Sequence, residues 1–174
     1  MNSSLWLIPE DPQFNECIKQ LARTNNNTSF QAHITLAGAM PTPATPETIA
    51  LLQSTAEFAV EADAIVTGDA YFQCVMARIV PSATLTRLAY TLHTEQYPAG
   101  AAAAAYFPHV SLVYSSMPAN EREDTARWCR EEIALPRRMA VRRVQEWQTE
   151  GSDVASWRMT REFCLLPSQA SVST

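Results

Sequence analysis

The sequence has no run of about 18 apolar residues, the length that a membrane-spanning helix requires. Its first residues, MNSSLWLIPEDPQF, also lack the basic start and the long apolar stretch of a secretory signal peptide. We therefore expect no membrane span and a cytoplasmic location, with association with an organelle left open. The length of 174 residues and the 47% of apolar residues are sufficient for a sizeable hydrophobic core.

Motifs of several common catalytic classes are missing. There is no Walker loop, no GxSxG nucleophile turn, no HExxH zinc helix and no aspartate cluster that could hold a metal. The four cysteines form no CxxC pair and no zinc-like Cys/His spacing. We therefore expect neither a metal nor a cofactor. We interpret the cysteines as buried free thiols, with one or two disulfides as an alternative; they are Cys17, Cys74, Cys129 and Cys164.

The sequence also has few basic residues: it contains 13 Lys and Arg against 18 Asp and Glu, which gives a net charge of −5. A protein that coats DNA or long RNA needs many cations against the phosphates, so we expect no long nucleic acid as a partner. A small anionic substrate is still compatible, because a local pocket can overcome a mild overall charge. One cluster of cations could meet a phosphate of a larger substrate but is more typical of a solvated strand edge; it comprises Arg137, Arg138, Arg142 and Arg143.

Periodicity and turn residues divide the chain into alternating strands and helices. Strands are predicted over 3–8, 32–37, 64–71, 74–80, 109–115, 139–149 and 157–165. Helices are predicted over 12–24, 46–59, 82–93 and 120–135. Asp11 and Thr45 are suitable N-caps for the first two helices. The alanine-rich segment 97–107 is compatible with either a loop or a helical turn.

The order of these elements in the second half of the chain repeats much of the first half. Such an order predicts an α+β fold with antiparallel pairing, built from two similar lobes with sheets that face a central cleft and helices outside. We expect one bilobal domain over residues 1–166 and a disordered polar tail over 167–174.

Two short apolar segments carry the same pattern, a histidine followed two positions later by a hydroxyl residue. They are AHITL at 32–36 and PHVSL at 108–112, and they contain two of the three histidines. In a strand, side chains at i and i+2 point to the same face, so each segment pairs an imidazole with a hydroxyl. Serine is not a favoured strand residue, so Ser111 in an apolar strand must be hydrogen-bonded or must line a cleft.

Two imidazoles and two hydroxyls around one small volume suit acid/base chemistry on a phosphate. The ordinary pKa of an imidazole is about 6.5, so near neutral pH one histidine can accept a proton while the other donates one. The hydroxyls of Thr35 and Ser111 can donate hydrogen bonds to phosphate oxygens. The alternative for either pair alone is a hydrogen-bonded histidine in a partly buried strand, and the duplication favours the functional interpretation.

The two HxT/S motifs resemble those of the 2H phosphoesterase superfamily. Within it, SLWLIPE at 4–10 and HVSLVY at 109–114 are similar to the cyclic phosphodiesterases of plants and fungi. The resemblance extends over about residues 3–166. It implies hydrolysis of 2′,3′-cyclic nucleotides to 2′-phosphates and of ADP-ribose 1″,2″-cyclic phosphate, in connection with tRNA splicing. It also implies that His33 and His109 are catalytic and that Thr35 and Ser111 bind the phosphate.

Tyr114 matches an aromatic residue near the ligand in this branch. Strict alternation instead places its side chain on the face opposite Ser111, so it needs a bend or bulge to reach the cleft, and a core tyrosine is the alternative. Tyr71 and Phe72 could stack on a base, although core packing is the more common role. We expect His93 to be structural, at a helix C-terminus. Core positions are expected for Trp6, Trp128, Trp147 and Trp157.

These observations predict a metal-independent hydrolase of small cyclic ribose phosphates that acts as a monomer. We take His109 as the base and His33 as the acid, although the symmetry of the motifs leaves the order open. Two alternatives remain. One is an RNA-end-processing phosphoesterase that acts on oligonucleotides, and the other is a non-catalytic module that binds cyclic-phosphate ends.

Overall fold

The computed structural model describes residues 2–96 and 106–168. The strands in this part of the chain are β1 (Ser3–Pro9), β2 (Ile34–Met40), β3 (Phe58–Thr67), β4 (Val75–Ile79), β5 (His109–Val113), β6 (Arg137–Gln148) and β7 (Arg158–Cys164). The helices are α1 (Pro12–Thr24), α2 (Pro46–Ser54), α3 (Ala83–Gln96) and α4 (Ala119–Glu132), with short 3₁₀ turns at Tyr71–Gln73 and Val154–Ser156. None of the helices described is long and apolar enough to cross a membrane.

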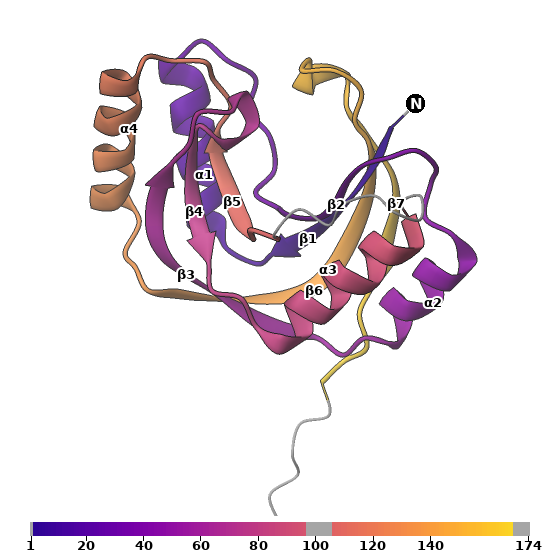
Figure 1. Cartoon of the computed structure of the whole chain (residues 1–174). Coiled ribbons are helices and arrows are strands. Elements are labelled where there is room, and N and C mark those ends of the chain that lie inside the picture. The colour runs from indigo at the N-terminus through magenta and orange to yellow at the C-terminus, as the bar shows by residue number, and fades with distance from the viewer. Residues whose placement is uncertain (1, 97–105, 169–174) are drawn as a thin grey trace, which may run out of the picture.

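The strands form an antiparallel sheet in the order β1-β2-β5-β4-β3-β6-β7, with a further pairing between β1 and β6. Strand β6 is long and curved: its first residues pair with β3 and its later residues pair with β1 and β7 (Figure 1). The sheet is therefore divided into two lobes, which are joined by β6 and by the pairing of β2 with β5. The first lobe contains β1, β2, β7 and the end of β6, and the second contains β3, β4, β5 and the start of β6.

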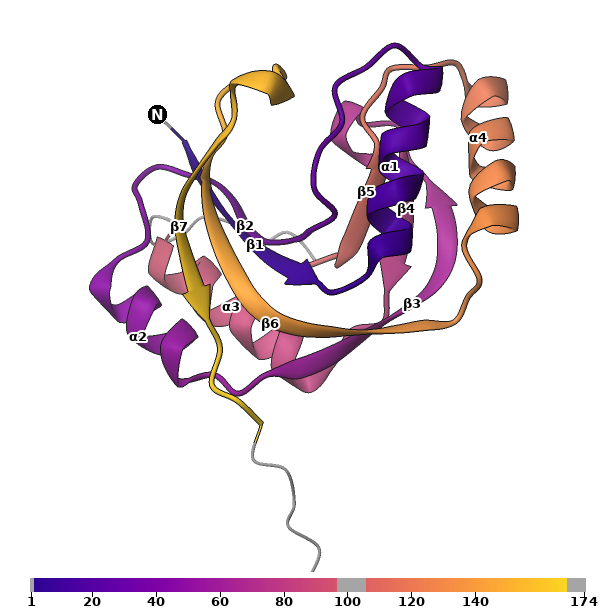
Figure 2. The ribbon, with the colours of Figure 1, turned by 180° about the vertical axis from the view of Figure 1, so that it is seen from behind.

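Helices cover the outer faces of both lobes. Helices α2 and α3 pack against β7 and β2, whereas α1 and α4 pack against β5, β3 and β4 (Figure 2). Helix α1, from the first half of the chain, therefore packs on β5 of the second lobe. Helix α3, from the second half, packs on β2 of the first lobe. The α+β architecture with two lobes agrees with the sequence prediction.

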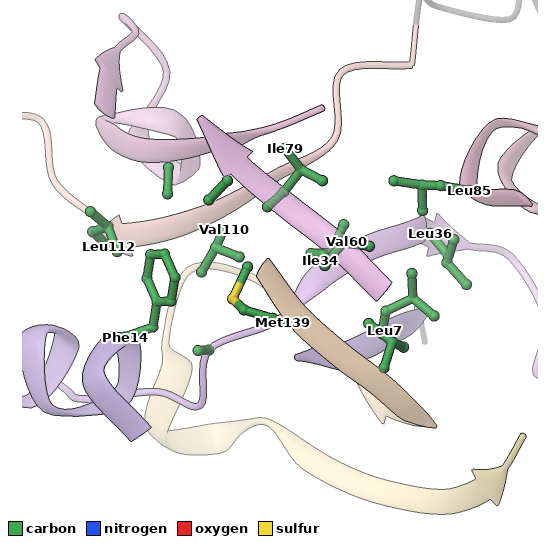
Figure 3. Packing of buried hydrophobic residues seen from close by; sticks show 14 of the residues in the cluster. Leu7, Phe14, Ile34, Leu36, Val60, Ile79, Leu85, Val110, Leu112 and Met139 are labelled. Carbon is green, nitrogen blue, oxygen red and sulfur yellow. The ribbon is translucent and has the colours of Figure 1, made fainter. Parts of the chain in front are cut away.

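The core lies between the helices and the sheet. Phe14 of α1, Val110 and Leu112 of β5, and Ile34 of β2 are among the buried side chains that meet there (Figure 3). Asp11 starts α1 as expected, because its carboxylate accepts hydrogen bonds from the backbone N–H groups of Gln13 and Phe14. The buried apolar residues of β2 and β5 hold both histidine segments on a rigid support.

The prediction for the second helix is wrong in its length. Helix α2 ends at Ser54, not at Ala59, and β3 begins at Phe58, six residues before the predicted strand. The helix ends because the backbone of Thr55 is extended. The Thr55 hydroxyl donates a hydrogen bond of 2.8 Å to the Leu51 carbonyl. The residues after Phe58 then alternate between buried and exposed while they pair with β6, so tertiary pairing overrides the helical periodicity.

The cluster of arginines lies on β6. The prediction of a strand edge is wrong for Arg143, which pairs with β1 and with β7, whereas Arg137 and Arg138 pair with β3 alone. Three of these cations form ion pairs: Arg137 with Asp11, Arg142 with Glu10 and Glu57, and Arg143 with Glu162. The cysteines are free thiols, but Cys164, the last residue of β7, is exposed, so the expectation that all four are buried is wrong for this one. Most of the predicted tail, residues 169–174, lies outside the described part of the chain.

Candidate active site

A single backbone pairing brings the two histidine segments together. Strands β2 and β5 meet at Ile34 opposite Val110, and both of these side chains are fully buried in the core. The residues before and after Ile34 and Val110 in each strand point to the opposite face of the sheet, which lines the cleft. Because the strands are antiparallel, His33 lies beside Ser111 and Thr35 lies beside His109. The cleft therefore has two similar imidazole–hydroxyl sets related by an approximate two-fold axis.

His33 is buried at the deeper side of the cleft, with 5% of its surface exposed. Its ring stacks on Trp6, with the ring centroids 3.7 Å apart and an interplanar angle of 10°. Burial lowers the pKa of His33 from 6.5 to about 4, although the hydrogen bond to the Gln31 carbonyl opposes this shift. A charge on His109 lowers the same pKa further. His33 is consequently neutral near pH 7.

His109 lies nearer to solvent and is half-buried. Its ring stacks loosely on Phe107, with centroids 5.6 Å apart. Burial lowers the pKa of His109 below its ordinary 6.5, and the Phe107 carbonyl opposes the shift. His33 loses its proton first as pH rises, since its burial is the more complete.

The two histidines share one hydrogen-bond pattern. Nδ1 of His33 lies 2.7 Å from the Gln31 carbonyl oxygen, and Nδ1 of His109 lies 2.8 Å from the Phe107 carbonyl oxygen. A carbonyl oxygen only accepts, so each Nδ1 carries the proton. Each neutral ring therefore presents Nε2 as the atom that can gain or lose a proton, as acid/base chemistry requires.

The two hydroxyls differ in their present partners. Ser111 is buried, and its Oγ donates a hydrogen bond of 2.8 Å to the Phe72 carbonyl. Thr35 is half-buried and lines the cleft, while its carbonyl accepts from the Tyr106 hydroxyl at 3.1 Å. A phosphate bound between the histidines would meet Thr35 directly, whereas Ser111 would have to turn its single proton away from Phe72.

Tyr114 reaches the cleft, which strict alternation did not predict. Val75 pairs with Val113 and the adjacent Met76 pairs with Ser111, so β5 contains one extra residue at Leu112. This β-bulge reverses the alternation and places Tyr114 on the same face as Ser111. The Tyr114 hydroxyl lies 3.3 Å from His33 Nε2, and burial raises its pKa, so it stays protonated and donates to that nitrogen.

All five predicted site residues line one cleft of about 1020 Å³; they are His33, Thr35, His109, Ser111 and Tyr114. The third histidine, His93, also lines this cleft, from α3. The sequence analysis expected a structural role for His93 and did not predict its position in the cleft wall. Phe72 lines it with 40% of its surface exposed, whereas Tyr71 is not among the lining residues. Of the tryptophans, Trp6 and Trp157 line the cleft rather than only filling the core.

Sequence reasoning missed the aromatic wall behind His33. Trp6 stacks on Trp147 with centroids 4.7 Å apart and meets the edge of Trp157 at 5.8 Å. Trp6 lies opposite Thr35 in the β1–β2 pairing, so the two side chains share the cleft face. Strand β1 is buried along its whole length, so its sequence has no alternation that could single out Trp6. Within the described residues, no three His, Cys, Asp or Glu side chains are grouped as metal ligands.

A family model for cyclic phosphodiesterase-like proteins matches residues 1–173. The chain belongs to this family. It is therefore a 2H phosphoesterase and a hydrolase of phosphodiesters. None of the curated proteins matches this cyclic phosphodiesterase-like protein in sequence.

Solved structures share its fold at low sequence identity. E. coli LigT in apo form aligns with a TM-score of 0.56 and 14% identity, over 95% of this chain and 97% of that chain. LigT complexed with 3′-AMP gives a TM-score of 0.57 and 13% identity, over 95% and 98%. TT0787 of Thermus thermophilus gives a TM-score of 0.63 and 13% identity, over 94% and 97%. These alignments support the two-lobed α+β fold for this cyclic phosphodiesterase-like protein.

Proposed function

We propose that this chain hydrolyses 2′,3′-cyclic nucleotides to nucleoside 2′-phosphates by acid/base catalysis with His33 and His109. The observation that carries the proposal is the pairing of Ile34 with Val110, which places two imidazoles and two hydroxyls on one face of the sheet. Both imidazoles present Nε2 to a cleft that is large enough for a nucleotide. ADP-ribose 1″,2″-cyclic phosphate contains the same kind of ring ester and is the second candidate substrate.

The two histidines have different roles in this proposal. We take His33 as the base, because its deeper burial keeps Nε2 neutral and able to accept a proton. His109 is the acid, because it is closer to solvent and keeps a proton to a higher pH. This order is the reverse of the one that we chose from the sequence, where the two motifs are equivalent.

In the reaction, a water oxygen attacks phosphorus while His33 Nε2 takes one of its protons. The bond between phosphorus and the ribose O3′ breaks on the opposite side, and His109 gives its Nε2 proton to that oxygen. The Thr35 hydroxyl donates to a non-bridging oxygen as negative charge develops on it. The Tyr114 hydroxyl, which donates to His33 Nε2, is displaced by the attacking water.

The regiochemistry of the product tests the proposal. A 2′,3′-cyclic phosphate has two similar leaving oxygens, and it opens to a mixture in water. A site that fixes the ribose can align only one of them with the attacking water and the acid. We expect the 2′-phosphate as essentially the sole product from 2′,3′-cyclic AMP, measured by phosphorus NMR on the purified protein.

Chemical hydrolysis of the same compound without protein provides the control mixture. Predominant 3′-phosphate would contradict the assignment to the plant and fungal branch, although acid/base hydrolysis would stand. Absence of turnover on any 2′,3′-cyclic nucleotide would contradict the proposed function itself.

A further inference from the structure

We propose that a second cavity, next to the catalytic cleft, binds the nucleoside that an extended substrate carries beyond its reacting ribose. ADP-ribose 1″,2″-cyclic phosphate is such a substrate, because a pyrophosphate joins its adenosine to the reacting ribose. The cyclic phosphate then lies in the cleft and the adenosine in the second cavity. This inference rests on the proposed function and assigns a further binding site within it.

The second cavity has a volume of about 720 Å³ and is lined by α1, by residues 28–31 and by the turn between β6 and β7. Figure 2 shows this turn opposite α1 and the segment that follows it. Trp6 and Trp157 line the catalytic cleft as well, so the two cavities adjoin. The volume lies within the range of small-molecule sites and is sufficient for one nucleoside.

Stacked aromatic rings lead from the cleft to the second cavity. His33 lines the cleft, Trp6 lines both cavities, and Trp147 lines the second cavity only. These three rings stack in this order, with the centroids of Trp6 and Trp147 4.7 Å apart. Phe30 of the second cavity stacks on Tyr114 of the cleft, with centroids 4.0 Å apart. A base in the second cavity therefore continues a stack that begins at a catalytic histidine.

Two of these rings have surface available for a base. Phe30 and Trp147 line the cavity and are half-buried. Within the described residues, the ring of Trp147 contacts only the ring of Trp6, so no other ring covers the second face of its indole. Bases of every kind stack on such a face, because each has a π-surface. An aromatic heterocycle is thus the class of group that this cavity favours.

Hydrogen-bonding side chains lie beside these rings. Thr28 and Gln31 line the cavity, and their side chains make no hydrogen bond with another described residue. Asn15, in the same wall, is instead fixed by the backbone: its Oδ1 accepts from the Ala32 N–H at 2.9 Å, and its Nδ2 donates to the Asp11 carbonyl at 3.2 Å. Thr28 and Gln31 are therefore available for the edge of a base or for ribose hydroxyls.

The second cavity is electrically neutral. Its charged lining residues, in the described part of the chain, are Lys19 and Glu16, which form an ion pair at 2.7 Å. A neutral aromatic cavity suits an uncharged nucleoside, whereas a phosphate that leaves water needs cations or several strong donors. We therefore place the adenosine in the cavity and its pyrophosphate at the junction with the cleft.

The junction provides groups that suit a pyrophosphate. Trp157 lines both cavities, and its indole N–H is buried without an acceptor among the described residues. A buried donor without a partner is unfavourable, and a phosphate oxygen at the junction would supply the acceptor. Arg158, the next residue, is exposed at the start of β7 and forms no ion pair with a described carboxylate, so a cation is available at the rim.

The test compares ADP-ribose 1″,2″-cyclic phosphate with ribose 5-phosphate 1,2-cyclic phosphate, which has the same reacting ring but no adenosine. We expect kcat/KM to be at least tenfold higher for the ADP-ribose compound, because the stacked base adds binding energy. The dinucleotide ApA with a 2′,3′-cyclic end is compared with 2′,3′-cyclic AMP in the same way. Its expected gain is below about threefold, because its linkage is one phosphate shorter.

Substitutions that fill the second cavity test the location. Ala155 and Ser29 are exposed and line this cavity from opposite walls, and neither lines the cleft. Ala155→Trp and Ser29→Trp should each reduce the advantage of the ADP-ribose compound to less than about threefold. The rate with ribose 5-phosphate 1,2-cyclic phosphate should change less than about threefold. Ala119→Trp, at the exposed start of α4 and outside both cavities, is the matched control and should change neither rate.

The possible results separate the two proposals. No turnover on any of the cyclic phosphates contradicts the proposed function. Turnover with less than a tenfold advantage for the ADP-ribose compound leaves the function standing and overturns the second site. An advantage that survives both cavity-filling substitutions overturns it too, and so does an equal loss on both ribose compounds in both variants. A tenfold gain for the dinucleotide alone would assign the cavity to an RNA end and contradict the adenosine of ADP-ribose as its occupant.

Discussion

Replacement of either cleft histidine by alanine, His33→Ala or His109→Ala, is expected to lower kcat for 2′,3′-cyclic AMP by about 10²–10⁴-fold. Each substitution removes one of the two Nε2 atoms that transfer protons in the proposed mechanism. Steady-state turnover on purified variants gives the measurement, with circular dichroism and thermal unfolding to establish that each variant is folded.

The third histidine provides a matched comparison. His93→Ala makes the same substitution in the wall of the same cleft, on α3. Its expected loss is below about tenfold, because His93 has no part in the proton transfers. A folded His33→Ala or His109→Ala variant with nearly wild-type kcat would contradict the two-histidine mechanism, and so would an equally large loss in His93→Ala.

The second large effect is expected at Trp6, whose substitution Trp6→Ala should lower both stability and activity. The side chain is 3% exposed and stacks between His33 and Trp147, so its removal leaves a cavity at the junction of two strands. Such substitutions cost about 3–5 kcal/mol in the free energy of unfolding. His33 also loses its flat support, and a misplacement of about 1 Å can reduce kcat about 10²-fold.

Urea unfolding and kcat, measured on the same preparations, separate these two effects. Trp128→Ala is the control, because Trp128 packs partly buried against the core from α4 and lines neither cavity. It should lower stability while kcat at a temperature well below unfolding changes less than about threefold. If Trp6→Ala kept wild-type kcat under the same conditions, the proposed support of His33 by Trp6 would be wrong.

The part of the site that sequence reasoning could predict is the part governed by local rules. The period of two in a strand places Thr35 with His33 and Ser111 with His109, and the structure keeps this arrangement. The caps at Asp11 and Thr45 also act as expected, since each depends only on the first turn of its helix.

The remainder depended on contacts between distant residues. The bulge at Leu112 exists only in the pairing of β5 with β4, so alternation within β5 gave the wrong face for Tyr114. The stacking of Trp6 on His33 and the entry of His93 into the cleft likewise arise from β1 and α3 packing beside β2. The unequal burial of the two histidines could not be read from two nearly equivalent motifs, and it reverses our choice of acid and base.

The pH dependence of kcat/KM for 2′,3′-cyclic AMP tests the central claim most directly, because it reports the ionisation of the free protein. His33 must be neutral, so activity rises with pH through a pKa of about 4. His109 must be protonated, so activity falls as pH rises past a pKa that burial holds below 6.5. We predict a bell with its maximum between these values, whose rising limb is lost in His33→Ala and whose falling limb is lost in His109→Ala. A wild-type rate that rises steadily to pH 9, or a variant that keeps both limbs, would contradict the claim.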